Sequence, residues 1–179
     1  MIKIFATLHL WMLVANFCWV MAYKNVEAAV VPENQLKAAY LIHLSEFTTW
    51  PEDKMQQLTH FNICIASDSL LREPLEQIKG REIKNKPLEI LYDVPAENLN
   101  TCHIFYVEDK LNKKVFQQNL SKSASILTVS SDPDFVKEGG IIEYYRADDK
   151  VRMRVNLKVM TQSKLIISSK LLRLMDSSF

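Results

Sequence analysis

The sequence predicts an α/β fold: a three-layer sandwich whose mixed, mostly parallel sheet carries helices on both faces. Segments 61–66, 102–107 and 125–129 are strand-forming runs without a charged residue, as expected of strands covered on both sides. Helical patterns separate these runs, which is typical of parallel strands joined by crossovers. Segment 141–157 alternates on either side of Ala147-Asp148-Asp149, which indicates an antiparallel hairpin near the C-terminus.

The first element in chain order is a secretory leader. Lys3 precedes an apolar run from Ile4 to Val20, and Val20-Met21-Ala22 offers small or medium residues for cleavage. We therefore expect residues 1–22 to be a signal peptide, with cleavage as late as residue 28 as a second option. The alternative is a transmembrane anchor, although His9 and Asn16 interrupt the run.

Export leaves about 157 residues, which suit one domain with a substantial core. We expect a single α/β domain at residues 33–179. The chain has 22 Lys and Arg against 21 Asp and Glu, and removal of Lys3 makes the two totals equal. A near-neutral protein offers no basic surface to gather nucleic-acid phosphates, so nucleic acid is not expected among its partners.

The elements of this domain follow from periodicity and from residues that interrupt it. Apolar and aromatic residues recur every three or four positions after residue 35, which predicts a helix of about fifteen residues ending at Trp50-Pro51. The other expected elements are a strand at 61–66, a short helix at 69–80 closed by Gly80, a strand at 86–93, a turn or half-helix at 94–101, a strand at 102–107, a helix at 112–122, a strand at 124–130, a loop at 131–140, the hairpin at 141–157, a short helix at 158–164, a short strand at 165–168 and a final helix at 169–175.

Two cysteines remain after cleavage, Cys64 and Cys102, because Cys18 lies in the leader. In an oxidising compartment the simplest interpretation is one disulfide, which would stabilise the fold by about 4 kcal/mol. Two free buried thiols are the alternative. A zinc site is less favoured, because there is no Cys-x-x-Cys and His103 points away from its neighbour Cys102 in an extended strand.

Seven residues are candidates for a partner or ligand surface: Glu46, Trp50, Gly139, Gly140, Arg152, Arg154 and Arg173. The tryptophan, next to Glu46 at a helix exit, would anchor an interface, or else cap the core. The double glycine would open a ligand cleft, or else form a turn. The arginines would pair with a partner's carboxylate, or else form solvated salt bridges.

The sequence does not favour an enzyme. It contains no Gly-x-Ser-x-Gly, no phosphate-binding loop, no His-Glu-x-x-His and no Ser-x-x-Lys. Nothing places His43, His60 or His103 against a nucleophile, and Ser168-Ser169 is a typical helix N-cap. We expect no catalytic residues, no cofactor and no metal.

Several co-linear motifs resemble the YfiR family of periplasmic regulators. They are "KAAYLIHLSEFTTWP", "FNICIAS", "CHIFYV", the "LTVSS…F…GG" loop and the ending "NL…L.ISS.LLRL", and they run in order from Lys37 to Met175. The resemblance implies a disulfide that corresponds to Cys64 with Cys102. Some family members carry a second disulfide near the double glycine, and this sequence has no cysteine there.

The resemblance also implies a function by binding. YfiR-like proteins occupy the periplasmic sensor domain of an inner-membrane diguanylate cyclase and repress it, and an outer-membrane, peptidoglycan-associated lipoprotein sequesters them, which raises cyclic-di-GMP and promotes biofilm formation. Family members tend to form homodimers. The expected protein is therefore a periplasmic repressor. The alternative is a small-molecule-binding module that modulates a membrane sensor.

Overall fold

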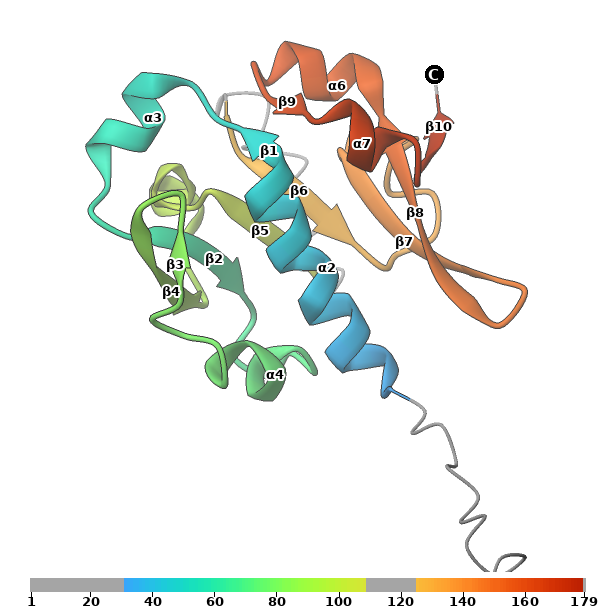
Figure 1. Ribbon diagram of the computed structural model, residues 1–179, viewed down its shortest axis with the longest axis horizontal. Coiled ribbons are helices and arrows are strands. Elements are labelled where there is room, and N and C mark those ends of the chain that lie inside the picture. The colour runs from blue at the N-terminus through green and yellow to red at the C-terminus, as the bar shows by residue number, and fades with distance from the viewer. Residues whose placement is uncertain (1–30, 109–124, 179) are drawn as a thin grey trace, which may run out of the picture. The chain divides into compact units, whose positions relative to one another are not determined.

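The computed structural model in Figure 1 describes residues 31–108 and 125–178, and Val31–Phe179 form one compact unit. The expected leader at 1–22, its later cleavage position at 28 and the expected helix at 112–122 lie outside the described residues. The helical elements are α2 (Glu33–Phe47), α3 (Glu52–Gln57), α4 (Arg72–Glu76), the 3-10 helix η1 (Ala96–Thr101), α6 (Leu157–Gln162) and α7 (Ser169–Leu172). The strands are β1 (Thr48–Thr49), β2 (Phe61–Ile65), β3 (Glu82–Ile83), β4 (Lys86–Tyr92), β5 (Ile104–Val107), β6 (Leu127–Ser130), β7 (Ile142–Ala147), β8 (Lys150–Asn156), β9 (Ile166–Ile167) and β10 (Asp176–Ser178).

The main sheet has eight strands in the order β10-β8-β7-β6-β5-β2-β4-β3. Strands β4, β2, β5, β6 and β7 are parallel to one another, while β8 returns antiparallel to β7 and β3 is antiparallel to β4. A separate two-stranded antiparallel sheet joins β1 to β9. The predicted mixed, mostly parallel sheet with an antiparallel hairpin is confirmed.

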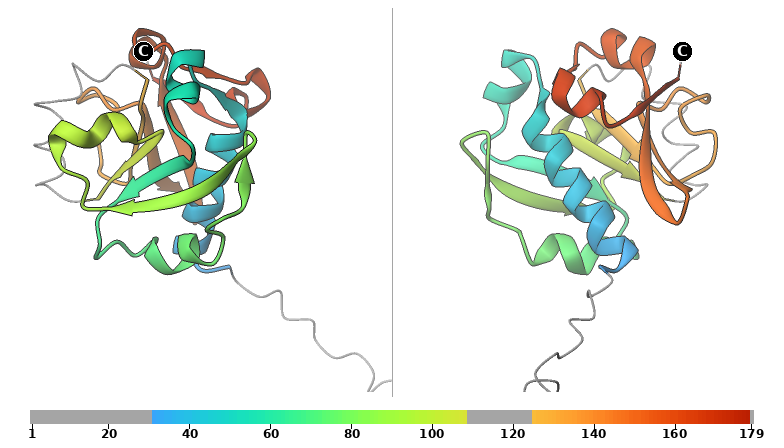
Figure 2. Two further views of the ribbon diagram at one scale, coloured as in Figure 1. Left: turned by 90° about the vertical axis from the view of Figure 1, so that its left-hand side faces the viewer. Right: turned by 45° about the vertical axis from the view of Figure 1, so that its right-hand side comes forward.

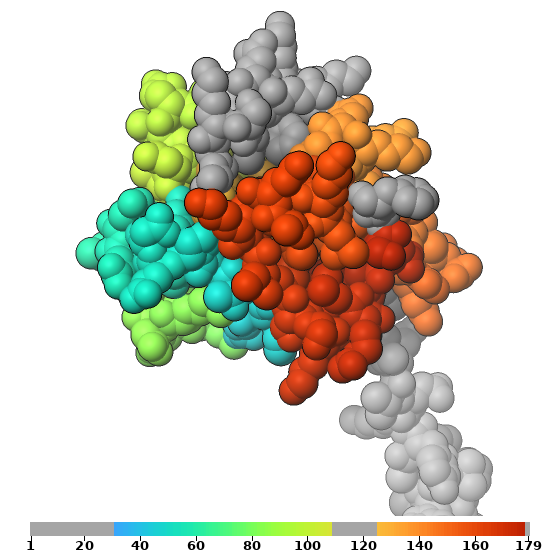
Figure 3. All heavy atoms as spheres, turned by 90° about the horizontal axis from the view of Figure 1, so that it is seen from above, coloured from blue at the N-terminus to red at the C-terminus, as the bar shows by residue number. Residues whose placement is uncertain are grey.

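The central strands are buried because each carries apolar residues on both faces. All residues of β2, β5 and β6 are buried. One face packs against the apolar side of α2, which crosses the sheet, and against α6 and α7 (Figure 2). The other face packs against η1 through Leu99 and against the 131–140 loop through Phe135. Figure 3 shows α6 and α7 beside α3 on one surface of the molecule.

The structure adjusts two predicted boundaries. Helix α2 ends at Phe47, before Trp50-Pro51, because Thr48 and Thr49 pair with β9. Strand β5 begins at Ile104, because Cys102 is the C-terminal cap of η1. The hairpin turn is as expected: Asp148 and Asp149 have φ of 50° and 55°, the left-handed values required in a two-residue turn.

Besides β1, three further short elements among the described residues were not predicted. Helix α3 follows Pro51 and contains one apolar residue, Met55. Its sequence therefore shows no helical spacing of apolar residues. Strand β3 has two residues, and β10 exists because Asp176 to Ser178 pair in parallel with Arg154 to Asn156 of β8. Such pairing is decided by tertiary contacts, which single-sequence patterns do not record.

Candidate functional site

The predicted surface residue Trp50 lies in the core. It is 4% exposed, its ring packs edge-on against Phe61, and its Nε1 donates a hydrogen bond to the His103 carbonyl oxygen at 3.2 Å. A partner could therefore not reach this ring in the folded domain. The structure places Trp50 as a link between the end of α2 and the start of β5, which is the core-capping alternative.

The double glycine accommodates an aromatic side chain. A Cβ atom on Gly140 would lie 2.1 Å from the Phe135 ring, and Phe135 is fully buried. Gly139 has φ of 98°, in the region that favours glycine. Both residues therefore complete the turn that leads into β7.

Two of the predicted arginines, Arg152 and Arg154, lie two positions apart on β8, whereas Arg173 follows α7. Arg154 Nη1 lies 2.8 Å from the buried Glu143 carboxylate, and its guanidinium stacks 4.4 Å from the centre of the Tyr145 ring. Arg152 pairs with Asp148 at 3.0 Å in the hairpin, and Arg173 is exposed after α7. The structure does not bring the three together in one site.

Glu46 lies at one end of a groove between α2 and α4. Its carboxylate accepts a hydrogen bond from Arg81 Nη2 at 2.9 Å, and its backbone carbonyl accepts one from Lys84 Nζ at 3.0 Å. The groove has a volume of about 260 Å³ and is lined by Ala38, Ala39, Ile42, Pro74 and Ile78, among others. Glu46 thus has partners within the domain and remains half-exposed.

The disulfide is present as predicted. Cys64 of β2 bonds to Cys102 at the end of η1, with 5.8 Å between their Cα atoms and 38 positions between them in sequence. The bond lies on the second face of the sheet with Leu99 and Phe105. It therefore fixes η1 against the neighbouring strands β2 and β5.

A cleft lies where strand β6 ends and β7 continues past it. We call it the carboxyl-end cleft. It has a volume of about 290 Å³ and is lined by Glu33, Lys37, Ser131, Pro133, Glu143, Tyr144, Tyr145, Arg146 and Val151. Helix α2 supplies one wall and the β7–β8 hairpin the other. In open α/β sheets, ligands bind outside the carboxyl ends of parallel strands, as this cleft is placed.

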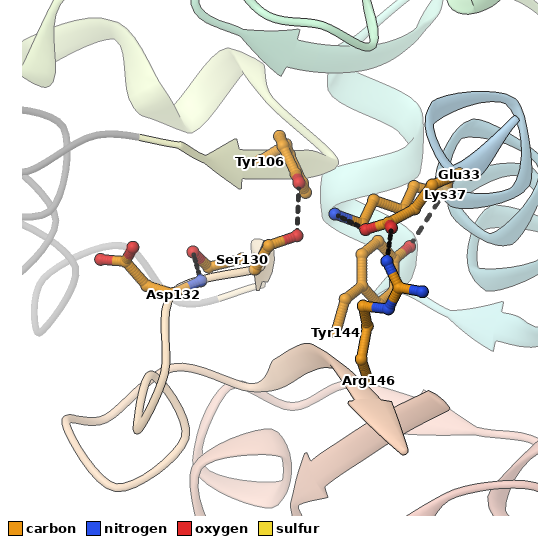
Figure 4. A network of polar contacts seen from close by, with 8 residues as sticks. Glu33, Lys37, Tyr106, Ser130, Asp132, Tyr144 and Arg146 are labelled. Atoms are coloured by element: carbon orange, nitrogen blue, oxygen red, sulfur yellow. Dashed lines mark hydrogen bonds and ion pairs between the residues drawn. The ribbon is translucent and has the colours of Figure 1, made fainter. Parts of the chain in front are cut away.

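The cleft contains two cations that share one carboxylate. Lys37 Nζ lies 2.7 Å from Glu33 Oε1, and Arg146 Nη1 lies 3.2 Å from Glu33 Oε2. Figure 4 shows Glu33 and Lys37 reaching from α2 toward Arg146. The hydrogen bond from Lys37 lowers the pKa of Glu33, so this carboxylate remains charged near neutral pH.

Tyr144 and Tyr145 line the cleft, and two further tyrosines pack against Tyr144. The Tyr144 ring packs against Tyr40 and Tyr106, with 6.0 Å and 6.2 Å between ring centres, and its hydroxyl donates to the Lys37 carbonyl oxygen at 3.4 Å. The Tyr106 hydroxyl lies 2.8 Å from Ser131 Oγ. Burial raises the pKa of Tyr106 to about 12 and that of Tyr144 well above its ordinary value, so both phenols stay neutral.

A second polar cluster is buried between α3, β2 and the start of β5. Asn62 donates its backbone N–H to His103 Nδ1 at 3.0 Å, so the neutral ring carries its proton on Nε2. Burial, reinforced by Lys54 and Lys86, lowers the pKa of His103 to about 3. Burial also lowers the pKa of Lys54, which donates to the Asn100 carbonyl oxygen, to about 8.

The charged groups of the cleft can bind a charged ligand, but the polar groups of the two clusters are not arranged as a catalytic site. Burial holds Tyr106 and Tyr144 neutral, and Glu143 accepts hydrogen bonds from Arg154 and from the Val136 N–H. Within residues 31–108 and 125–178, no three His, Cys, Asp or Glu side chains are placed to hold a metal ion. The arrangement fits recognition of a ligand or partner.

The sequence analysis missed Glu33, Lys37 and Arg146. One signal was present: Glu33 precedes Lys37 by four positions, the spacing of an ion pair on a helix. Nothing in the sequence relates this pair to Arg146, which lies 113 positions from Glu33. That proximity arises only when α2 packs against the β7–β8 hairpin.

Comparison with known proteins places the chain in a family. The model of the YfiR/HmsC-like family matches residues 34–175. The chain belongs to the YfiR/HmsC-like family. This is a family of periplasmic regulators and not of enzymes, as the resemblance of the sequence motifs implied. The match spans the disulfide and the residues of the carboxyl-end cleft other than Glu33.

No curated protein matches the chain. Among solved structures, it is similar to a conserved domain protein from Vibrio cholerae O1 biovar El Tor, with 7% identity and a TM-score of 0.48. That similarity covers 79% of this chain and 60% of the Vibrio chain. Within the described residues, no helix is long and apolar enough to cross a bilayer.

Proposed function

We propose that this protein is a periplasmic repressor: it binds the periplasmic sensor domain of an inner-membrane diguanylate cyclase and so limits cyclic-di-GMP and biofilm formation. The observation that carries the proposal is the family match over residues 34–175. Cleavage of the leader at 1–22 would deliver the domain to the periplasm. Its output would be stoichiometric, since the repressor acts by occupying its target.

The surface that we propose for the cyclase lies on the small β1–β9 sheet. Strand pairing places Thr49 opposite Ile166, and Ser168 donates its N–H to the Phe47 carbonyl oxygen at 2.8 Å. Phe47 is 40% exposed and Ile166 is 65% exposed, and Glu46 adjoins them. Exposed apolar side chains beside a charged residue are the composition of a protein-binding surface.

The test uses a strain that carries the cyclase and lacks the repressor. Deletion is expected to raise cellular cyclic-di-GMP, and the wild-type chain to restore it. Ile166→Asp, which places a charge in the proposed interface, is expected to fail to restore it. Leu70→Asp is the matched control, because Leu70 is 69% exposed and lies in the loop before α4.

Two results would count against the proposal. If deletion does not raise cyclic-di-GMP, the proposed repressor function is wrong. If both variants restore low cyclic-di-GMP equally, the proposed role of the β1–β9 surface is wrong. Affinity capture with the wild-type chain would then identify the membrane protein. The same capture tests two further partners that we propose: an outer-membrane, peptidoglycan-associated lipoprotein and a second copy of this chain.

A second candidate function is a small-molecule-binding module that modulates the membrane sensor. The observation that favours it is the carboxyl-end cleft, which combines a cavity of about 290 Å³ with charged and hydroxyl groups. The two functions are compatible, because ligand binding in the cleft and partner binding on the β1–β9 sheet use different residues. Ligand-dependent stabilisation of the purified domain tests this candidate.

A further inference from the structure

We propose that the carboxyl-end cleft binds a small organic monoanion, in which a carboxylate attached to an apolar body lies between Lys37 and Arg146. This proposal specifies the ligand class of the second candidate function and does not depend on the repressor function. It rests on the charge balance of the cleft, on its apolar walls and on the elements that it connects.

The charge balance of the cleft leaves one positive charge. Glu33 is the carboxylate that pairs with both Lys37 and Arg146. Arg146 also approaches Asp149 at 3.7 Å, but the Asp149 side chain is fully exposed, so solvent screens this contact. One negative charge brought by a ligand would therefore neutralise the site.

The other carboxylate in the cleft does not change this balance. Glu143 accepts hydrogen bonds from Arg154 Nη1 at 2.8 Å and from the Val136 N–H at 3.2 Å, so both of its oxygens are occupied. Its presence, with Glu33, opposes a second negative charge on the ligand. The site is thus matched to a monoanion and not to a phosphate dianion.

The guanidinium of Arg146 is suited to a carboxylate. Its planar fork can donate two parallel hydrogen bonds to the two oxygens of such a group. The Lys37 ammonium, which is mostly buried in the cleft wall, adds a charge-assisted donor on the α2 side. A ligand carboxylate would share these donors with Glu33 and bridge the two walls.

The remaining walls of the cleft are largely apolar and fit an apolar part of the ligand. Tyr144, Val151 and Pro133 line the cleft, and the Tyr144 phenol stays neutral because it is buried. The ring of Tyr144 is held by Tyr40 and Tyr106, so the wall is rigid. An aromatic or aliphatic group would bury apolar surface there, and Ser131 adds a hydroxyl to the lining.

Binding would join two parts of the chain that are distant in sequence. Glu33 and Lys37 belong to the first two turns of α2, whereas Arg146 is on β7, next to the hairpin turn. A carboxylate between them would add a bridge from helix to hairpin. The ligand would therefore stabilise the packing of α2, the helix that leads into the β1–β9 sheet.

The test measures binding of benzoate, benzamide and inorganic phosphate to the purified mature protein by calorimetry. We expect saturable benzoate binding in the millimolar range or tighter, at least about tenfold weaker benzamide binding, and no phosphate binding at the same site. Arg146→Gln and Lys37→Gln should each weaken benzoate binding at least about tenfold. Arg152→Gln, which removes an equal charge from the same hairpin outside the cleft, should leave it unchanged.

Several outcomes would overturn the proposal: no saturable benzoate binding, equal binding of benzamide or phosphate, or equal loss in Arg152→Gln and Arg146→Gln. Circular dichroism of each variant shows whether it is folded, and chemical-shift changes confined to cleft residues locate the bound benzoate. A negative result in the benzoate experiment does not refute the proposed repressor function, because cyclic-di-GMP is not part of this measurement. Conversely, Ile166→Asp should bind benzoate normally even if it fails to repress.

Discussion

Two polar clusters among the described residues each contain a lysine, but in opposite settings. The buried cluster around Lys54 and His103 has lost water, and its histidine is held neutral with a pKa of about 3. The carboxyl-end cleft keeps Lys37, Glu33 and Arg146 paired and within reach of solvent. Burial keeps the His103 ring neutral in the first cluster, whereas the hydrogen bond from Lys37 keeps the Glu33 carboxylate charged in the second.

The difference separates a structural role from a recognition role. In the buried cluster, His103 Nε2 and Asn62 Oδ1 have no hydrogen-bond partner among the described residues, so the cluster already carries a cost in stability. A new charge there would be more costly still. In the cleft, an additional anion meets charged donors. We therefore expect changes in the buried cluster to alter stability and changes in the cleft to alter binding.

The largest effect is expected from the disulfide, which adjoins the buried cluster through Cys102 and His103. A Cys64→Ala/Cys102→Ala double variant should lose about 4 kcal/mol of unfolding free energy, because the unfolded chain is no longer constrained by the cross-link. Urea denaturation measures this change. Reduced wild-type protein should unfold at the midpoint of the double variant, and an unchanged midpoint in both samples would refute the structural role.

The next effect concerns the loop that borders both the cleft and the second face of the sheet. Gly140→Ala should cost about 3 kcal/mol, at the upper end for overpacking, because the new Cβ would lie 2.1 Å from the fully buried Phe135 ring. Denaturation of Gly140→Ala, Phe135→Leu and the double variant measures the coupling. The double variant should lose less than the sum of the single losses, and simple additivity would contradict the proposed clash.

A pH titration sharpens the contrast between the clusters. The pKa of His103 is about 3 in the folded protein and about 6.5 when unfolded, so the unfolded state binds the additional proton between these values. Stability is therefore fully present above pH 6.5 and falls as the pH drops toward 3, by about 2 kcal/mol between pH 6.5 and 5. Denaturation at several pH values measures this slope.

Matched variants assign the slope to one residue. His103→Gln should remove it, whereas His60→Gln should retain it, because His60 is exposed. Lys54→Met should reduce the total loss of stability near pH 3, since Lys54 contributes to the lowered pKa of His103. A slope that survives in His103→Gln would show that other groups cause the acid sensitivity.

The fold was predictable where the sequence pattern is local and strong. Strands β2, β5 and β6 are uncharged runs, and the hairpin turn at Asp148 and Asp149 has the residues that its geometry requires. The disulfide followed from having two cysteines for one bond. Strand β10 was not predictable, because its three residues pair with β8 only after α7 has reversed the chain.

The candidate site was less predictable than the fold. The sequence left Trp50 two roles, an interface anchor or a cap on the core. Its ring packs beside Phe61 in the core, which a helix-exit position does not reveal. Arg154 was selected for its place on the hairpin, and its structural partner is the buried Glu143. Arg146 is another arginine of the same hairpin, on strand β7. Only the packing of α2 against the hairpin distinguishes it from Arg154 as a cleft residue.

The smallest effect on stability is expected in the cleft. It tests most directly whether the cleft, unlike the buried cluster, serves binding and not stability. Glu33→Gln removes a carboxylate from two partly exposed ion pairs, so it should cost less than about 1 kcal/mol in denaturation experiments. The same change removes the group that competes for Lys37 and Arg146, so benzoate binding should strengthen. A loss of stability of several kcal/mol, or weakened benzoate binding, would show that Glu33 holds the fold together and that the cleft, like the buried cluster, is structural.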